Sequence, residues 1–378
     1  MKRMMTTLST RVLYLLALFS LVPVAAPAQE VLPTDVHADS RNRLPSIQSD
    51  APRGAAGIRQ HGSGVAVRWE SPLGRGLTEL AILVTAREHN QLFEWSLHEL
   101  AGIAVGLDPK VIEVVRNRQP RTKVGTKKSV IIQIGREIFR EHQLSSETYA
   151  HALRVLGETN LVDIVDLMGT YTRVGAWLTA FNQQMPPGWK QFLPLPFTPP
   201  DDIHPDSRSR LPYVRAQTSN TATPVLYSRS IAPQGTGPAQ IRRHGAGVES
   251  LERSVGRRLM GLVILVTARE HDAQYQWTMN ELGALKEGLE PSVIELVRHR
   301  GPVTGLPEKE AVLIEFGREL FAEHNVSSQT YARALEIFGE TDLVDFVKLM
   351  AQHAGDATLL TAFDQHLPAG QEPLLPIP

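Results

Sequence analysis

The chain has 378 residues, 42% of them apolar, so it is long enough for two or three domains with hydrophobic cores of their own. Its 40 acidic and 39 basic residues leave a net charge of −1, which argues against nucleic acid or an anionic membrane surface as a partner. The absence of cysteine excludes disulfides, thiol redox chemistry and thiolate metal sites.

Residues 1–28 have the composition of a secretory signal peptide. Basic residues precede an apolar stretch from Val12 to Val22, and Ala26-Pro27-Ala28 resembles a signal-peptidase site. The alternative is a retained membrane anchor, but about 11 apolar residues fall short of the roughly 20 that a spanning helix needs. We expect cleavage before Gln29, export to the periplasm or medium, and no membrane attachment afterwards.

Most of the remaining chain is duplicated. Gly74 to Phe181 aligns with Gly256 to Phe363 at a constant offset, without a gap, and roughly half of the positions are identical. An upstream segment recurs as well, because "DVHADSRNRLP" from Asp35 is answered by "DIHPDSRSRLP" from Asp202. The duplication predicts two tandem domains of one fold.

The repeat and the Pro-rich stretches divide the chain into six predicted segments. In order, they are the signal peptide (1–28), an N-terminal arm (29–73), domain 1 (74–185), a Pro-rich linker with a second arm (186–255), domain 2 (256–368) and a tail (369–378).

Apolar residues within each copy follow helical spacing. In the first copy the pattern predicts helices in five stretches: 77 to 104, 109 to 118, 127 to 141, 146 to 156 and 160 to 184. Asp108 and Pro109 supply a cap and a first-turn proline, and Pro186-Pro187 is expected to stop the last helix. The β-branched "SVIIQI" at Ser129 could form a strand, but the residues after it keep helical spacing. We therefore expect an all-α protein.

Glu94 and His98 form the candidate catalytic pair. Four residues apart on a helix, they share one face, and a carboxylate beside an imidazole suits proton transfer near neutral pH. The alternative is an ordinary polar pair on a helix surface. In the second copy the two positions hold Gln276 and Asn280, which keep hydrogen bonding but cannot transfer protons, whereas Trp95 is retained in both copies.

Other polar residues nearby are weaker candidates. Arg87 could bind a substrate carboxylate, or form a salt bridge at a helix end, and Trp95 could make the surroundings drier. We expect no metal, because Gly102 stands where a zinc-protease motif would need its second histidine. The histidines at 142 and 324 precede helix starts and are expected on the surface.

Each copy resembles the carboxymuconolactone decarboxylase-like family, related to the alkylhydroperoxidase D-like proteins. The likeness rests on "LTELAILVTAREHNQLFEWSLHELAGIAVGLDPKVIEVV", "GREIFREHQLSSETYAHAL" and "LVDIVDLMGTYTRVGAWLTAFNQQMPPG". It implies an all-helical fold that assembles into symmetric oligomers and needs no cofactor. It also implies that His98 transfers protons. We propose Glu94 as the residue that orients His98, and Tyr171, which is His353 in the second copy, as a further hydroxyl in the pocket. Gln91 and Glu94 stand where peroxidase members have cysteines, which excludes the thiol route of peroxide reduction.

Together these features predict an exported, cofactor-independent enzyme, a carboxy-lyase or lactone-processing enzyme that acts on a small carboxylic acid or lactone at domain 1. Export counts against γ-carboxymuconolactone itself, since its degradation pathway is expected inside the cell. The alternative is a non-catalytic protein of the same fold that binds a small ligand or supports assembly. Fold alone does not decide between them.

Overall fold

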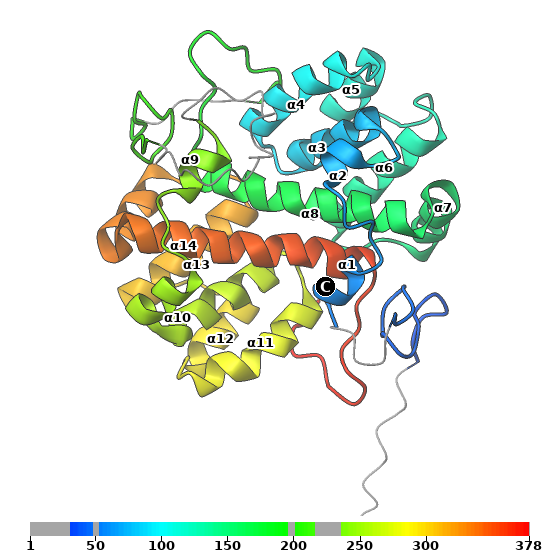
Figure 1. The fold of residues 1–378 in the computed structure, drawn as a ribbon. Helices are drawn as coiled ribbons and strands as arrows, with labels where there is room; N and C mark the ends of the chain where they lie inside the picture. Colours follow the sequence, from blue (N-terminus) through cyan, green and yellow to red (C-terminus); the bar gives the residue numbers. More distant parts are fainter. Residues whose placement is uncertain (1–30, 48–52, 196–200, 216–235, 378) are drawn as a thin grey trace, which may run out of the picture. The chain divides into compact units, whose positions relative to one another are not determined.

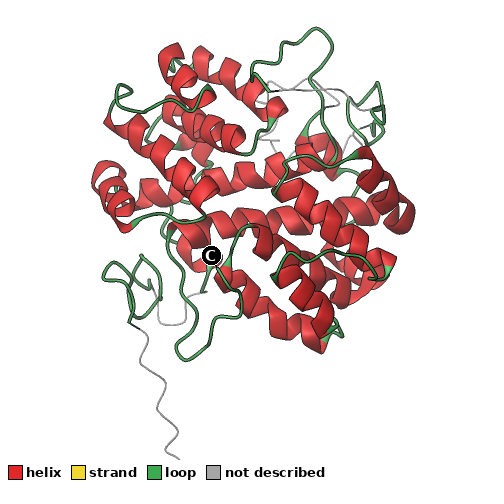
Figure 2. Ribbon diagram, turned by 180° about the vertical axis from the view of Figure 1, so that it is seen from behind, coloured by secondary structure: helices red, strands yellow, loops and turns green. Residues whose placement is uncertain are grey.

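The computed structural model describes residues 31–47, 53–195, 201–215 and 236–377. The predicted signal peptide, residues 1–28, lies outside these ranges. Every regular element within them is a helix, and the one β-bridge, between His204 and Ser209, is isolated (Figure 2). The predicted all-α fold class is therefore confirmed.

The first half of the chain contains two short helices followed by a set of longer ones. In order, they are α1 (Ala55–Arg59), α2 (Val67–Glu70), α3 (Arg75–Glu88), α4 (Leu92–Ala104), α5 (Pro109–Arg116), α6 (Thr126–Arg136), the π-helical turn η1 (Glu137–Glu141), α7 (Ser146–Leu156) and α8 (Glu158–Ala180).

The second half repeats this order. Its helices are α9 (Pro238–Arg242), α10 (Val248–Glu270), α11 (Gln274–Lys286), α12 (Pro291–Arg298), α13 (Glu308–Phe321) and α14 (Ser328–Ala362). Both α11 and α12 begin and end at the repeat equivalents of the bounds of α4 and α5. The repeated sequence thus forms corresponding helices, while the division into domains at 74–185 and 256–368 stays a prediction.

Local signals in the sequence explain several helix starts. The side chain of Asp108 accepts a hydrogen bond from the amide of Lys110 at 2.9 Å, so the predicted cap of α5 is confirmed. Ser145 and Ser327 cap corresponding helical segments in the two halves by accepting from the amides of Thr148 and Thr330. Each cap satisfies an amide that has no partner inside its helix.

Some predicted boundaries are wrong. The helix expected to reach Gln184 ends at Ala180, because Asn182 adopts a left-handed conformation (φ 45°) and the amide of Gln183 turns back to the carbonyl of Leu178 at 2.8 Å. The prolines at 186 and 187 follow this turn and do not cause it. The stretch predicted as one helix from 77 to 104 is two helices, and the arms contain α1, α2 and α9.

Two long helices, α8 and α14, lie side by side (Figure 1). Two buried glycines, Gly169 and Gly355, lie at their contact. A Cβ added to Gly169 would lie 2.6 Å from the carbonyl oxygen of Gly355, and one added to Gly355 would lie 2.7 Å from that of Gly169. Only glycine allows backbones so near to each other.

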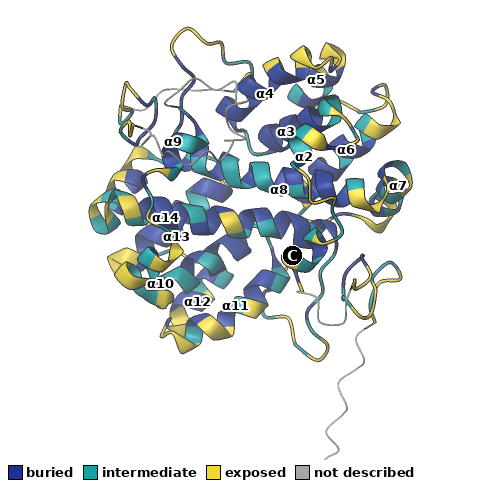
Figure 3. Cartoon of the chain, viewed as in Figure 1, coloured by how far each residue is buried: buried dark blue, intermediate teal, exposed yellow. Residues whose placement is uncertain are grey.

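Each half also contributes side chains to the core of the other half. The core built on α3 and α6 to α8 includes Leu359 and Phe363, at the end of α14. The core built on α10 to α14 includes Phe93 from α4 and Phe181 from the end of α8. Much of α8 and α14 is accordingly buried, although α14 also carries exposed residues such as Gln352 (Figure 3).

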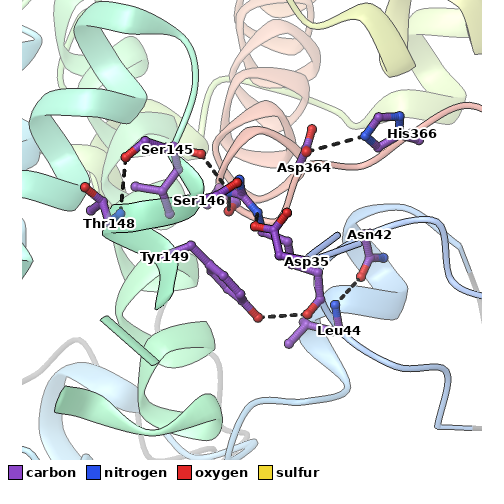
Figure 4. Close-up of polar contacts among 12 residues, drawn as sticks. Asp35, Asn42, Leu44, Ser145, Ser146, Thr148, Tyr149, Asp364 and His366 are labelled. Carbon is purple, nitrogen blue, oxygen red and sulfur yellow. Dashed lines mark hydrogen bonds and ion pairs between the residues drawn. The ribbon is translucent and has the colours of Figure 1, made fainter. Parts of the chain in front are cut away.

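The first arm fastens the two halves together through Arg43. Its buried guanidinium donates to the carbonyls of Leu144 in the first half (2.7 Å) and Ala362 in the second (3.1 Å), and it pairs with Asp35 at 2.9 Å. The hydroxyl of Tyr149, on α7, donates to the carbonyl of Arg43 at 2.8 Å, so the backbone of the arm is bound as well as its guanidinium (Figure 4).

The second arm repeats this arrangement through Arg210. Its guanidinium donates to the carbonyls of Val326 (2.8 Å) and Ala180 (3.3 Å) and pairs with Asp202 at 2.9 Å, while Tyr331 donates to its carbonyl. We call the two arrangements the Arg43 clasp and the Arg210 clasp.

In the part of the chain that the structure describes, no helix combines the length and apolar character needed to cross a membrane.

Candidate functional site

The imidazole of His98 lies between two carboxylates. Glu94 shares a face of α4 with it, and Nε2 of His98 is 3.0 Å from Oε2 of Glu94. Nδ1 of His98 donates to Oε2 of Glu79, on α3, at 2.6 Å. No more than 6% of any of these side chains is exposed. The predicted contact between Glu94 and His98 is present, and a second acid joins it.

Two arginines hold the other oxygen of Glu79. Nε of Arg68, from α2, lies 3.0 Å from Oε1, and Nη2 of Arg75, at the start of α3, lies 2.5 Å from it. Both guanidinium groups also lie over the ring of Trp69, at 4.5 Å and 4.0 Å from its centroid. Both arginines are half-buried, so they are the most exposed charged side chains of this cluster.

These contacts shift the pKa of both partners. Burial alone would raise the pKa of Glu79, but the hydrogen bond from His98 and the positive charges of His98 and Arg68 outweigh it and lower the pKa to about 2. Burial alone would lower the pKa of His98, but its contacts with Glu79 and Glu94 raise the pKa above its usual value of 6.5. The imidazolium is therefore the favoured form of His98 at pH 6.5.

The cluster has more positive than negative charge when His98 is protonated. Three cations face two carboxylates, which leaves a net charge of +1 (Arg68, Arg75 and His98; Glu79 and Glu94). Within the described residues, Oε2 of Glu94 is buried and accepts no hydrogen bond, although it is within ion-pair distance of His98. Because a buried acceptor without a hydrogen bond is costly, a donor group on a bound ligand would be favoured beside Oε2 of Glu94.

Tyr171, from α8, packs against the imidazole. The two rings meet edge to face, with 4.9 Å between centroids and 83° between planes. Burial raises the pKa of Tyr171 despite the nearby charge of Arg68, so its hydroxyl stays protonated and can donate a hydrogen bond. The structure thus brings together three of the predicted site residues, His98, Glu94 and Tyr171.

Arg87 and Trp95 lie in other contacts. Nε of Arg87 donates to the carbonyl of Arg116 at 2.7 Å, and its Nη1 donates to Asn90 at 2.8 Å. Trp95 is fully buried and donates to Glu99 at 2.7 Å. These bonds hold the two side chains outside the His98 cluster, and their part in substrate binding stays a prediction.

At the corresponding place in the second half, the described residues form no charged cluster. Asn280 stands for His98 and donates to the carbonyl of Gln276 at 2.7 Å, while Gln276 donates to the carbonyl of His353 at 2.9 Å. The counterpart of Glu79 in the second copy is Gly261, which has no side chain to offer. Backbone hydrogen bonds have replaced the ion pairs of the first half.

Three members of the site were not predicted from the sequence: Glu79, Arg68 and Arg75. Glu79 could have been found by the same comparison that singled out Glu94 and His98, because this acid, directly before the apolar run from Leu80 to Val84, aligns with a glycine in the second copy. Arg68 lies before the aligned region, in the predicted arm. No sequence signal connects it to the cluster.

His142 and His324 were expected on the surface, and this expectation is wrong. Both are half-buried and line a cavity together with His89 and His271. The rings of His89 and His324 meet edge to face at 5.6 Å. Their position before a helix start could not reveal this, because residues of the other copy cover them: Asp272 lies against His142, and His89 lies against His324.

Within the described ranges, no group of three or more histidine, aspartate or glutamate side chains is placed to hold a metal ion. Comparisons with protein-family models, with curated proteins and with solved structures give no significant match. Membership in the carboxymuconolactone decarboxylase-like family stays a prediction from the sequence.

Proposed function

We propose that this chain is an exported enzyme of the carboxymuconolactone decarboxylase-like type, which transfers a proton to or from a small carboxylic acid or lactone. The observation that carries the proposal is the contact of both ring nitrogens of His98 with carboxylates, at 2.6 Å and 3.0 Å. An imidazole so paired is held in one orientation and has a raised pKa, as a general acid needs.

The proposed reaction uses His98 as the acid. When a substrate carboxylate leaves as carbon dioxide, the electron pair of the broken C–C bond passes into the conjugated carbonyl of the substrate. The imidazolium of His98 then donates its proton to the carbon, and the neutral imidazole takes a proton back from water. Glu79 and Glu94 stabilise the imidazolium between turnovers.

A substrate with one carboxylate matches the charge of the cluster. The net charge of +1 falls to zero when such a substrate binds, and Arg68 and Arg75 can bind a carboxylate in two-pronged fashion. Because the two arginines are the more exposed members of the cluster, we propose that the substrate enters from their side, past α2. Stacking on Trp69 holds α2 closed in its absence.

The test measures proton transfer in the mature protein. Deuterium incorporation beside the carboxylate is followed by proton NMR over a panel of small carboxylic acids and lactones, with carbon dioxide release as a second readout. γ-Carboxymuconolactone is one panel member. We expect His98→Asn, which copies the second half, to reduce the rate by about 100-fold or more. Asn280→Ala is the matched control and should leave the rate unchanged.

Two results would contradict the proposal. One is a reactive panel member whose rate is the same in His98→Asn and in the wild type. The other is a panel in which no member reacts and none raises the melting temperature through the His98 cluster, which would give the cluster a structural role only.

We also propose that the protein forms a homo-oligomer. Equivalent helices of the two halves present apolar side chains to solvent: Leu100 and Ile103 on α4 are 37% and 47% exposed, and Met279 and Leu282 on α11 are 44% and 56% exposed. Light scattering should show more than one chain per particle, and Ile103→Lys should reduce that number. A strict monomer would contradict this proposal.

A further inference from the structure

A second site lies where the two halves meet. It is a cavity of about 400 Å³, within the roughly 300–1,000 Å³ range of small-molecule pockets. The ends of α3, α10 and α13, the turn η1 and the last turns of α14 surround it. No member of the His98 cluster lines it, so it is separate from the proposed proton-transfer site.

Six ring side chains dominate the wall, and they form three pairs related by the repeat. The members of each pair occupy equivalent positions in the two copies: His89 and His271, His142 and His324, and Phe139 and Phe321. His89 packs edge to face on Phe139 at 4.6 Å, and His271 does the same on Phe321 at 4.7 Å. The cavity therefore has approximately two-fold symmetric walls of flat rings.

His89 and His271 each have a ring nitrogen that can accept a hydrogen bond. Nδ1 of His89 lies 2.9 Å from the carbonyl oxygen of Thr85, and Nδ1 of His271 lies 2.9 Å from that of Thr267. A carbonyl can only accept, so Nδ1 carries the proton and Nε2 carries the lone pair. Neither Nε2 atom accepts a hydrogen bond from the described residues, and each is free to accept one from a ligand.

The cavity carries no uncompensated charge. Burial lowers the pKa of His89, and it lowers those of His271 and His324 to about 3, so these rings are neutral at physiological pH. The two charged side chains that line the cavity, Arg300 and Glu270, pair with each other at 3.2 Å, and the ring of His142 lies 2.9 Å from Asp272. An anionic ligand would find no spare cation here.

We propose that this cavity binds a small, uncharged aromatic molecule with two hydroxyl groups, of the dihydroxybenzene class. One hydroxyl donates to Nε2 of His89 and the other to Nε2 of His271, while the ring packs among Phe139 and Phe321. Two acceptors and flat apolar walls match two donors on a flat ring.

Titration calorimetry of the full chain with catechol, resorcinol and hydroquinone tests the proposal. At least one of these should bind once per chain, and benzene and benzoate should bind at least about tenfold more weakly. His89→Phe and His271→Phe keep the ring shape but remove the acceptor, so each should weaken binding about tenfold or more. His299→Phe is the matched control on an exposed histidine, 63% exposed, and should change nothing.

A second kind of variant keeps the test independent of the buried histidines. Ala322→Trp lies at the exposed mouth of the cavity and should block entry without disturbing the core. His98→Asn should leave binding intact, so failure here is distinct from failure of the proposed enzyme activity. Benzoate binding more tightly than the diols, Zn²⁺ displacing them, or binding that survives both His→Phe variants and Ala322→Trp would each overturn the proposal.

Discussion

His98 shows how a buried ionisable group is tuned by opposing effects. Loss of water around the ring favours the neutral imidazole, whereas contacts with Glu79 and Glu94 favour the imidazolium, and the contacts win. Because the pKa in the folded state is raised, the stabilisation it gives is fully present below pH 6.5 and is lost as the pH rises through the folded-state value.

Glu79→Gln should lower the pKa of His98, because it removes the shorter of the two carboxylate contacts while the ring stays buried. NMR titration of labelled histidine, with the His98 signal assigned by His98→Asn, measures the change. The stability gained below pH 6.5 should shrink in the same variant. Glu295→Gln, at a carboxylate that is 56% exposed, is the control. An unchanged His98 titration in Glu79→Gln would show that the bond to Glu79 does not set its pKa.

The sequence could predict only the part of this site that lies within one helix. Four-residue spacing places Glu94 beside His98 whatever the rest of the fold does. Glu79 lies on a different helix, earlier in the chain, and helical periodicity does not say which faces of two helices meet. Arg68 comes from a segment predicted as an irregular arm, so its contact depends entirely on tertiary packing.

At the scale of the elements, apolar periodicity predicted which segments are helical better than it predicted where each helix ends. The capped start of α5 at Asp108 was predicted correctly, because the signal is local. The end of α8 at Ala180 was not, because it depends on a turn in which Asn182 adopts positive φ. Asparagine can adopt positive φ but usually does not, so Asn182 alone does not predict this turn.

The crossing of α8 and α14 makes a sharp prediction about two glycines. Gly169→Ala and Gly355→Ala would each press a Cβ against a backbone carbonyl of the facing helix, which cannot move aside as a side chain can. Each variant should lose about 1–3 kcal/mol of unfolding free energy or more, measured by urea denaturation. The double variant should lose less than the sum, because both changes disturb one contact.

Gly283→Ala provides the control for this experiment. Gly283 lies within α11, is exposed, and has no atom within 4 Å of the added Cβ. The free energy of unfolding should therefore stay the same or rise by up to about 1 kcal/mol, since alanine favours a helix more than glycine does. If Gly169→Ala behaves like Gly283→Ala, the two long helices are not in close contact in solution.

At the scale of the whole molecule, the two copies are interlocked. The repeat predicted two folded units in sequence, but it could not show that Leu359 and Phe363 of the second copy enter the core of the first. Nor could it show that the repeated segments "SRNRLP" and "SRSRLP" each join both halves through Arg43 and Arg210. Shared cores and clasps depend on contacts between residues far apart in the chain.

Interlocking predicts that the described part of the chain unfolds as one cooperative unit. Arg43→Ala removes bonds to the carbonyls of Leu144 and Ala362 and leaves Asp35 without its partner, so it should cost about 3 kcal/mol or more. Calorimetry should still show one transition, at a lower temperature. Hydrogen exchange should show weaker protection near Leu144 and also at the end of α14, which lies in the other half of the chain.

Arg210→Ala tests the same principle at the Arg210 clasp, where the loss should spread to the end of α8 and the residues near Val326. The control is Arg253→Ala, at an exposed arginine on α10, which should change stability by less than about 0.5 kcal/mol. Because each clasp bonds to both halves, neither variant should unfold one half alone. Two separate calorimetric transitions, or reduced protection confined to the half that carries the substituted arm, would mean that the copies fold independently and that the clasps do not couple them.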